Sequence, residues 1–468
     1  MSIILIKALQ LLCCLSLLVV LHEGGHFMFS KLFHVRVEKF YMFFNPYFHL
    51  FSTRDKWFAK LFPRIAKNET EYGIGWIPLG GYVKIAGMID ESMDKEQMKQ
   101  PAKPDEFRSQ PVWKRFFIMV GGVMMNLITA LVLYSAIMFT WGTDVLPMKN
   151  IKSGFVFNQT AKELGFQNGD IPLAINGETI RNYDTGILRM LSEAESVTVI
   201  RKGKKVTFHM PAEHPDLMEI ADMSPAFIRP FVPSQIDSVI PGSPAAKAGL
   251  YKDCRIQAVD GTLVRSWADF DSIMVRKSDV LASPTCTSKD SLRLRKMEVV
   301  YANWKNSKVD TVTIELDDKY MLGIVKSNIT DFAVVEHIDY SLLSCIPAGC
   351  AHGWDVLCGY VHDLKYVFSK KGAQSVGSFI TIGSIFPEAW NWQRFWELTA
   401  LISIILAVMN ILPVPGLDGG HIMFLLVEAV TRRPLSEKAQ TIAEYIGMGL
   451  LLALMVLAFG NDLVKFVF

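Results

Sequence analysis

The sequence lacks several features that mark common classes of protein. Its 468 residues carry 48 Lys and Arg against 46 Asp and Glu, a formal net charge of +2. There is therefore no excess positive charge of the kind that binds nucleic acid. The seven cysteines include no Cys-x-x-Cys pair, which argues against a cysteine zinc site. No small-residue cleavage site follows the first apolar run, so a removable signal peptide is not expected.

Long apolar runs are what the sequence does contain, and 50% of its residues are hydrophobic. About 20 predominantly apolar residues suffice for a helix to cross a bilayer. We therefore predict four membrane spans, over residues 3–21, 116–139, 398–412 and 446–460. The third run is preceded by Trp390, Trp392 and Trp396, and tryptophans gather where a membrane meets water.

The connecting segments predict the orientation of these spans. Short loops rich in Lys and Arg stay in the cytoplasm. Such residues lie between the first and second runs and again after the third, and examples are Lys56, Lys60, Arg64, Lys67, Arg432 and Arg433. This distribution places both termini and the long middle segment outside the cytoplasm.

The end of the first apolar run carries three ionisable residues, His22, Glu23 and His26. Residues i and i+4 share one face of a helix, so the two imidazoles can bind one zinc ion. Glu23 can then take a proton from water, as in the His-Glu-x-x-His motif of metallopeptidases. The alternative is a helix end whose histidines only meet lipid headgroups. Charged groups at membrane depth are costly and rare, which favours the metal site.

A third zinc ligand is expected at the same depth. The segment 410–424 follows the third run and reaches the cytoplasmic side as the first run does. Its prolines and glycines break the helix, and irregular backbone in a membrane is tolerated where it lines a cavity. Asp418 and His421 are both candidates, and spacing does not choose between them. Asp418 as an ordinary helix cap is the structural alternative.

These motifs together resemble the site-2 proteases, which are intramembrane zinc metalloproteases, and in particular the bacterial regulator of sigma-E protease branch. The pattern Asn-x-x-Pro-x-x-x-Leu-Asp-Gly fits residues 410–419. The resemblance implies that Asp418 is the third zinc ligand beside His22 and His26, with Glu23 as the general base. It implies substrates that are single-span membrane proteins, such as trimmed anti-sigma factors and remnant signal peptides.

The resemblance also assigns substrate-positioning residues. Asn410 and Pro413 belong to the pattern after the third run, and Asn126 ends a Gly-x-x-x-Asn motif in the second. Residues 72–87 read as a β-hairpin and resemble the family's membrane re-entrant loop, which contains Gly73 and Gly75. An exposed strand edge there could pair with an extended peptide.

The middle of the chain contains a weak internal repeat. Residues 159–180 align with residues 242–264, and each copy ends in an Asn-Gly or Asp-Gly turn that is typical of hairpins. The two copies resemble tandem PDZ domains, and by this resemblance the peptide groove of the second would include Leu322, Gly323 and Ile324. The modules either read an extended peptide or exclude bulky proteins from the membrane site, and the two roles are compatible.

We therefore predict an α-helical polytopic membrane protein with about four spans and two inserted extracytoplasmic PDZ-like α+β domains. The expected parts are a membrane domain at 1–143 and 393–468, PDZ-like domains at 144–231 and 232–330, and amphipathic helices at 331–392. Zinc is the expected cofactor, and the expected location is the bacterial inner membrane with the PDZ-like domains in the periplasm. Membrane lipids and an upstream site-1 protease acting on the same substrate are expected partners, and nucleic acid is not.

Two other classes of membrane protein fit the sequence less well. A catalytically inactive PDZ scaffold would not need a general base, so Glu23 argues against it. Four spans and a large soluble insert argue against a transporter.

Overall fold

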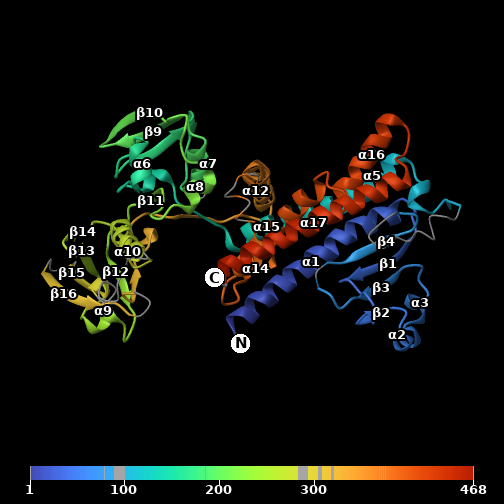
Figure 1. Ribbon diagram of the computed structural model, residues 1–468, viewed down its shortest axis with the longest axis horizontal. Coiled ribbons are helices and arrows are strands. Elements are labelled where there is room, and N and C mark those ends of the chain that lie inside the picture. The colour runs from blue at the N-terminus through green and yellow to red at the C-terminus, as the bar shows by residue number, and fades with distance from the viewer. Residues whose placement is uncertain are drawn as a thin grey trace. The chain divides into compact units, whose positions relative to one another are not determined.

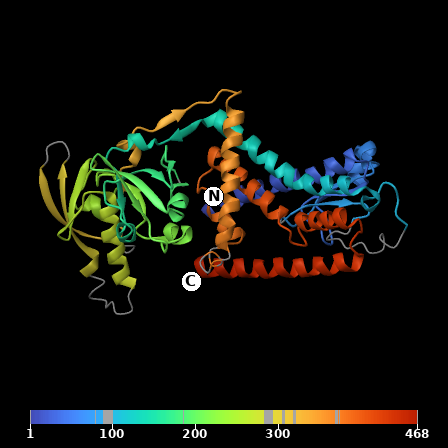
Figure 2. The same cartoon turned by 90° about the horizontal axis from the view of Figure 1, so that it is seen from above.

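The computed structural model describes residues 2–78, 80–88, 101–184, 186–282, 293–303, 308–317, 321–367, 369, 372, 374 and 376–466. The chain divides into two compact units (Figures 1 and 2). One contains Met1–Gly142 and Asp339–Phe468, and the other contains Thr143–Ile338. The first holds the long apolar helices and one β-sheet, and the second is built mainly of strands.

Among the described residues, four helices of the first unit are long and apolar enough to cross a membrane. They are α1 (Ile3–Leu32), α5 (Val112–Trp141), α15 (Trp392–Ile411) and the stretch Lys438–Lys465 of α17 (Glu437–Phe466). Each predicted apolar run falls on one of them, as fits a polytopic membrane protein with additional β-sheet regions. At 30 residues α1 is about 45 Å long, so the His-Glu-x-x-His motif lies within this helix and not at its end.

Helix α5 is the centre of the helical packing and contacts α1, α15 and α12 (Cys345–Val367). A Cβ at Gly25 of α1 would lie 2.1 Å from the Gly121 carbonyl oxygen of α5, so the two backbones touch there. A Cβ at the neighbouring Gly24 would have nothing within 4 Å, so packing does not explain why a glycine occupies this position. In Figure 2, α12 runs crosswise to α17, and its Gly349 packs against Ser135 near the end of α5.

A four-stranded sheet follows α1 and contains β1 (Val37–Met42), β2 (Phe51–Ser52), β3 (Glu71–Ile74) and β4 (Tyr82–Ile85). Its strand order is β2-β3-β1-β4. The predicted hairpin pairing over residues 72–87 is therefore wrong, because β1 lies between β3 and β4. Strand β1 buries Val37 and Tyr41 and is one of the two inner strands, while β4 is left at an edge beside α1.

Hydrogen bonds to one carboxylate add a side-chain link across three strands of this sheet. The Tyr41 hydroxyl on β1 and the Ser52 hydroxyl on β2 both donate to Glu71 of β3, at 2.6 and 2.7 Å. Burial by itself raises the pKa of the Glu71 carboxyl, but these donors outweigh burial and leave the pKa below its ordinary value. The carboxylate therefore stays charged as a link across three strands.

Short helices complete the first unit. Helices α2 (Lys56–Leu61) and α3 (Pro63–Ala66) connect β2 to β3. A 3-10 turn at Phe107–Ser109 precedes α5, and α14 (Phe379–Ser384) precedes α15. Helix α16 (Asp418–Thr431) lies between α15 and α17.

The second unit contains two modules with the same strand order and separate apolar cores. The first sheet runs β10-β9-β7-β8, which are Lys204–His209, Ser196–Arg201, Ile171–Ile175 and Glu178–Thr179. The second runs β16-β15-β13-β14, which are Val309–Glu315, Lys296–Asn303, Cys254–Val259 and Thr262–Leu263. This correspondence agrees with the repeat found in the sequence.

The predicted hairpin turns are confirmed. Asn176-Gly177 joins β7 to β8 and Asp260-Gly261 joins β13 to β14, and all four residues have positive φ. In each module a short helix precedes this hairpin. These helices are α6 (Gln159–Glu163) and α9 (Pro244–Lys247), and the modules also contain α7 (Gly186–Ser192), α8 (Leu217–Asp222) and α10 (Trp267–Ala282).

Shorter strand pairs complete the second unit. They are β6 (Phe155–Phe157) with β11 (Ile228–Pro230), β12 (Ile236–Val239) with β17 (Ile324–Lys326), and β5 (Thr143–Val145) with β18 (Glu336–Ile338). Ile329, Ala333 and Val335 return to the core of the first module, and a 3-10 turn occupies Ile329–Asp331. The first module is therefore built from both ends of the unit.

Candidate metal centre

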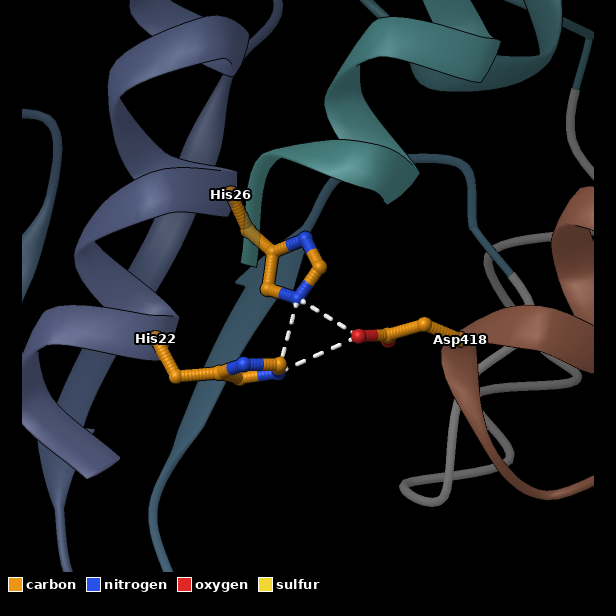
Figure 3. A group of neighbouring side chains, drawn as sticks. All are labelled: His22, His26 and Asp418. Carbon is orange, nitrogen blue, oxygen red and sulfur yellow. Dashed lines mark hydrogen bonds and ion pairs between the residues drawn. The ribbon is translucent and has the colours of Figure 1, made fainter. Parts of the chain in front are cut away.

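Three side chains from two distant segments converge in the first unit. His22 and His26 lie one turn apart on α1, and Asp418 is the first residue of α16 (Figure 3). The two Nε2 atoms are 3.3 Å apart, and Asp418 Oδ2 lies 3.1 Å from His22 Nε2 and 3.4 Å from His26 Nε2. The structure thus brings together the two histidines of the motif and one of the two candidates for the third ligand.

The spacing of these atoms fits a metal ion. Ligands bound at about 2.0–2.1 Å to a tetrahedral zinc ion lie roughly 3.3 Å from one another. His26 Nδ1 lies 2.8 Å from the Ile118 carbonyl oxygen, so Nδ1 carries the proton and Nε2 presents a lone pair. Asp418 Oδ2 is buried and has no hydrogen-bond partner in the described part of the chain. Lone pairs that face one another in this way fit a bound cation.

Helix α5 shapes the space for the two imidazoles. A Cβ at Gly122 would lie 2.4 Å from His26 Nε2 and 2.7 Å from His22 Nε2, so only glycine leaves room for both rings. Asn126, one turn further along α5, is fully buried with its amide nitrogen 3.1 Å from His22 Nδ1. Its Oδ1 has no partner among the described residues. An amide rotated by 180° would let Oδ1 accept the Nδ1 proton and fix His22 in the metal-binding tautomer.

Close backbone contacts place Asp418. Helix α15 ends at Ile411, and a compact loop leads to Leu417 immediately before α16. A Cβ at Gly419 would lie 2.0 Å from the Leu412 carbonyl oxygen, and one at Gly420 would lie 2.6 Å from the Pro415 Cα. The two glycines after Asp418 are therefore needed for α16 to start beside the loop that precedes it.

The cluster opens onto a cavity of about 880 Å³, within the usual range for ligand sites. Glu23 lines this cavity, and the backbone of Val83 on β4 lies against its carboxylate. Asn126 and Asn410 also line it, together with residues 80–85 at the β4 edge. The cavity therefore holds a candidate set of metal ligands, a further carboxylate and a strand edge within one unit.

Several residues predicted from the sequence lie elsewhere. Pro413 is exposed and does not line the cavity. Gly73 packs against the Tyr41 ring and Gly75 against the Phe44 backbone, so both are part of the sheet interior and not of the cavity wall. Their absence of a side chain serves strand packing. The glycines that do face the cavity from this segment are Gly80 and Gly81.

His421, the other candidate for the third ligand, lies outside the cluster. Its Nε2 is 3.9 Å from Glu444 Oε1 on α17, and both residues line the cavity. Sequence reasoning missed Glu444. An acidic residue at the start of an apolar span was the signal that could have found it.

The predicted peptide groove of the second module lies in or against the apolar core of that module. Leu322 belongs to the apolar core of that module. Gly323 has a φ of +76°, and a Cβ there would lie 2.3 Å from the Ser243 Cβ. Ile324 begins β17, which pairs with β12.

Comparisons with known proteins agree with this geometry. The family described as peptidase family M50 matches residues 10–454. The chain is 28% identical to the regulator of sigma-E protease RseP of Escherichia coli, over 96% of each chain. It is 26% identical to the regulator of sigma E protease of Haemophilus influenzae, over 96% of this chain and 97% of that one. A relative from Neisseria meningitidis with a zinc metalloprotease name is 28% identical over 98% of each.

Proposed function

Because the chain belongs to peptidase family M50 and is a zinc metalloprotease, we propose that it cleaves peptide bonds within or beside the membrane-spanning segments of single-span proteins. The observation that carries this proposal is the cluster of His22, His26 and Asp418 inside a unit of apolar helices. The sigma-E names of the relatives support anti-sigma factors as one substrate class. Remnant signal peptides are a second proposed class of substrate, to be cut by the same hydrolysis of a peptide bond.

Each residue of the site has a role in this proposal. His22, His26 and Asp418 hold zinc, and the fit of their separations to a zinc ion supports the assignment. Zinc, when bound, supplies a Lewis acid that polarises the scissile carbonyl and activates water. Glu23 takes the proton from the attacking water and delivers it to the departing amine nitrogen.

A substrate helix hides its backbone, so the segment to be cut must first become extended. The β4 edge lines the cavity beside Glu23 and has no strand on its outer side in the described sheet. We infer that the unwound segment pairs with this edge, while Asn410 donates a hydrogen bond to its backbone. A photo-crosslinking residue at position 82 should capture substrate, and capture from position 54 beside β2 instead would contradict this arrangement.

The two β modules act before cleavage in this proposal. Their shared strand order and their Asn-Gly and Asp-Gly hairpins support two PDZ-like domains. The distribution of Lys and Arg supports a multi-pass protein of the bacterial inner membrane with these modules in the periplasm. There they exclude bulky ectodomains, so that an upstream site-1 protease must shorten a substrate first.

Separate measurements of zinc content and cleavage test the site. Glu23→Gln should retain zinc and lose cleavage of a single-span reporter, because Glu23 is not a ligand. Asp418→Ala should lose both, whereas His421→Ala should retain zinc. Glu397→Gln is a matched control, because this glutamate pairs with Arg394 on α15 and does not line the cavity. Full cleavage by Glu23→Gln, or full zinc in Asp418→Ala, would show that the roles are wrongly assigned.

A further inference from the structure

An apolar surface stands out on the two short helices between β2 and β3. Trp57 and Leu61 lie one turn apart on α2 and are 62% and 66% exposed, and Ile65 on α3 is 42% exposed. The inner side of α2 is anchored by Phe58, whose ring centroid lies 5.1 Å from that of Phe51 on β2. The Trp57 ring also reaches Phe51, at 5.9 Å between centroids, but most of the Trp57 surface remains exposed.

Positive charge surrounds the same side chains. Four exposed cations lie on or beside the two helices, and none makes an ion pair with any residue that the structure describes: Lys56, Lys60, Arg64 and Lys67. The two nearby carboxylates already have partners, since Asp55 accepts from His49 at 2.8 Å and Glu69 pairs with Lys31 at 3.2 Å. The surface is thus apolar at its centre and cationic around it.

We propose that this surface, made of Trp57, Leu61, Ile65 and the four cations, docks onto anionic phospholipid at the membrane that the chain's own apolar helices occupy. Short amphipathic segments with aromatic and cationic side chains bind the headgroup region in this way. Tryptophan favours that region, and each Lys or Arg near an anionic surface adds to the attraction.

The position of α2 and α3 favours lipid over a protein partner. The strand order β2-β3-β1-β4 places β4 beside α1 and β2 at the opposite edge. Figure 1 shows α2 beyond β2, on the side of the sheet away from α1, and α3 packs against α2. The surface is therefore left open by the helices of its own unit, and its positive charge favours anionic lipid as the occupant. Docking there would hold one edge of the sheet at the membrane while the other edge lines the cavity.

The proposal does not depend on the metal site and can be tested without cleavage. The full chain is placed in nanodiscs of phosphatidylcholine with or without phosphatidylglycerol. A fluorescent aromatic amino acid replaces Trp57, and nitroxide-labelled lipids report its proximity to the headgroups. Quenching should be stronger when phosphatidylglycerol is present and should weaken as salt is added. The same probe at Asn68, which is exposed but outside the surface, should respond less.

A charge-neutralised variant sharpens the test. Lys56→Gln, Lys60→Gln and Lys67→Gln together should lower the ratio of docked to undocked protein roughly a hundredfold, about fivefold for each cation. The matched control neutralises Lys202, Lys204 and Lys205 of the β9–β10 hairpin, and its quenching should equal that of the parent. Quenching that does not change with phosphatidylglycerol or salt would overturn the proposal. An equal loss of quenching in both triple variants would also overturn it. Quenching that instead follows self-association of the chain would assign the surface to a second copy.

Discussion

At the scale of single residues, Gly122 decides whether the two histidines can converge. Its missing side chain is the space into which both imidazoles project, and the His26 ring is fixed from behind by the Ile118 carbonyl. The His26 ring cannot move away from a methyl group added at position 122 without losing its hydrogen bond to the Ile118 carbonyl oxygen. Gly24, which lies between the two histidines in sequence, faces open space.

This contrast gives the first prediction. Gly122→Ala should weaken zinc binding about 10–100-fold, the range seen when groups that orient metal ligands are disturbed. Gly24→Ala is the matched control and should retain zinc while gaining up to about 1 kcal/mol of helix stability. Zinc titration of both purified variants measures the difference. Equal zinc affinity in the two variants would mean that Gly122 does not set the space for the rings.

Asn126 gives a second prediction at this scale. It contacts His22 Nδ1, so we propose that it orients a ligand, in addition to facing the cavity. Asn126→Leu keeps the volume but removes the hydrogen bond, and it should lower zinc affinity about 10–100-fold. Thr129→Val on the same helix is the control, because Thr129 is buried but does not line the cavity. Unchanged zinc affinity with weaker substrate binding would instead favour the role predicted from the sequence.

At the scale of elements, the placement of Asp418 depends on how α16 is fixed. Arg115 near the start of α5 donates through Nη1 to Glu428 Oε2 at 3.1 Å and through Nη2 to Glu428 Oε1. Both side chains are only 14% exposed. Two-point pairs of this kind have a defined geometry, so this one holds the far end of α16 against α5. The near end of α16 carries Asp418.

Breaking this pair should loosen the metal centre from a distance. Glu428→Gln leaves Arg115 largely buried without a counter-charge and should destabilise the protein by about 1–3 kcal/mol, with weaker zinc retention. Glu397→Gln is the control, since its pair with Arg394 is exposed and worth at most about 1 kcal/mol. Thermal unfolding and zinc release are measured together. Partial recovery in the exchanged pair Arg115→Glu with Glu428→Arg would support the link, and identical unfolding of the two single variants would refute it.

At the scale of the whole molecule, the second unit can be deleted without leaving a gap between the chain ends of the first unit. Strands β5 and β18 pair with Thr143 opposite Ile338, so the unit begins and ends at neighbouring positions. A short flexible linker from Gly142 to Asp339 can therefore replace it. If the modules exclude bulky ectodomains, this deletion should let the protease cut an untrimmed reporter about as fast as a trimmed one.

A point variant distinguishes exclusion of bulky ectodomains by the modules from binding of an extended peptide by the second module. Val325 on β17 is exposed, so Val325→Asp alters the surface of that strand without a buried charge. Gly323 is unsuitable, because its positive φ and its closeness to Ser243 would strain any side chain. Under exclusion, Val325→Asp should leave cleavage of both reporters unchanged. A deletion variant that still rejects the untrimmed reporter while cutting the trimmed one would contradict exclusion.

The sequence by itself determined the features that depend on local spacing. Four apolar runs of membrane-spanning length, two histidines one helical turn apart, and Asn-Gly or Asp-Gly turns between strands are all set by neighbouring residues. Hydrophobic periodicity and turn chemistry act over a few residues, so they can be recognised without knowing the fold. The zinc metalloprotease class followed from these motifs and their resemblance to a family.

Tertiary structure alone decided which distant residues meet. Asp418 and His421 are equivalent candidates by spacing, and the compact loop before α16 brings the first to the histidines and the second to Glu444. The expected hairpin over residues 72–87 is wrong because β1 lies between its two strands, and β1 pairs with residues of β3 that are 32 positions further along the chain, as Lys39 does with Glu71. Gly73 and Gly75 allow close packing inside the sheet, whereas Gly122 leaves space for the imidazoles of His22 and His26. Such contacts join residues far apart in the chain, so a pattern of neighbouring residues cannot predict them.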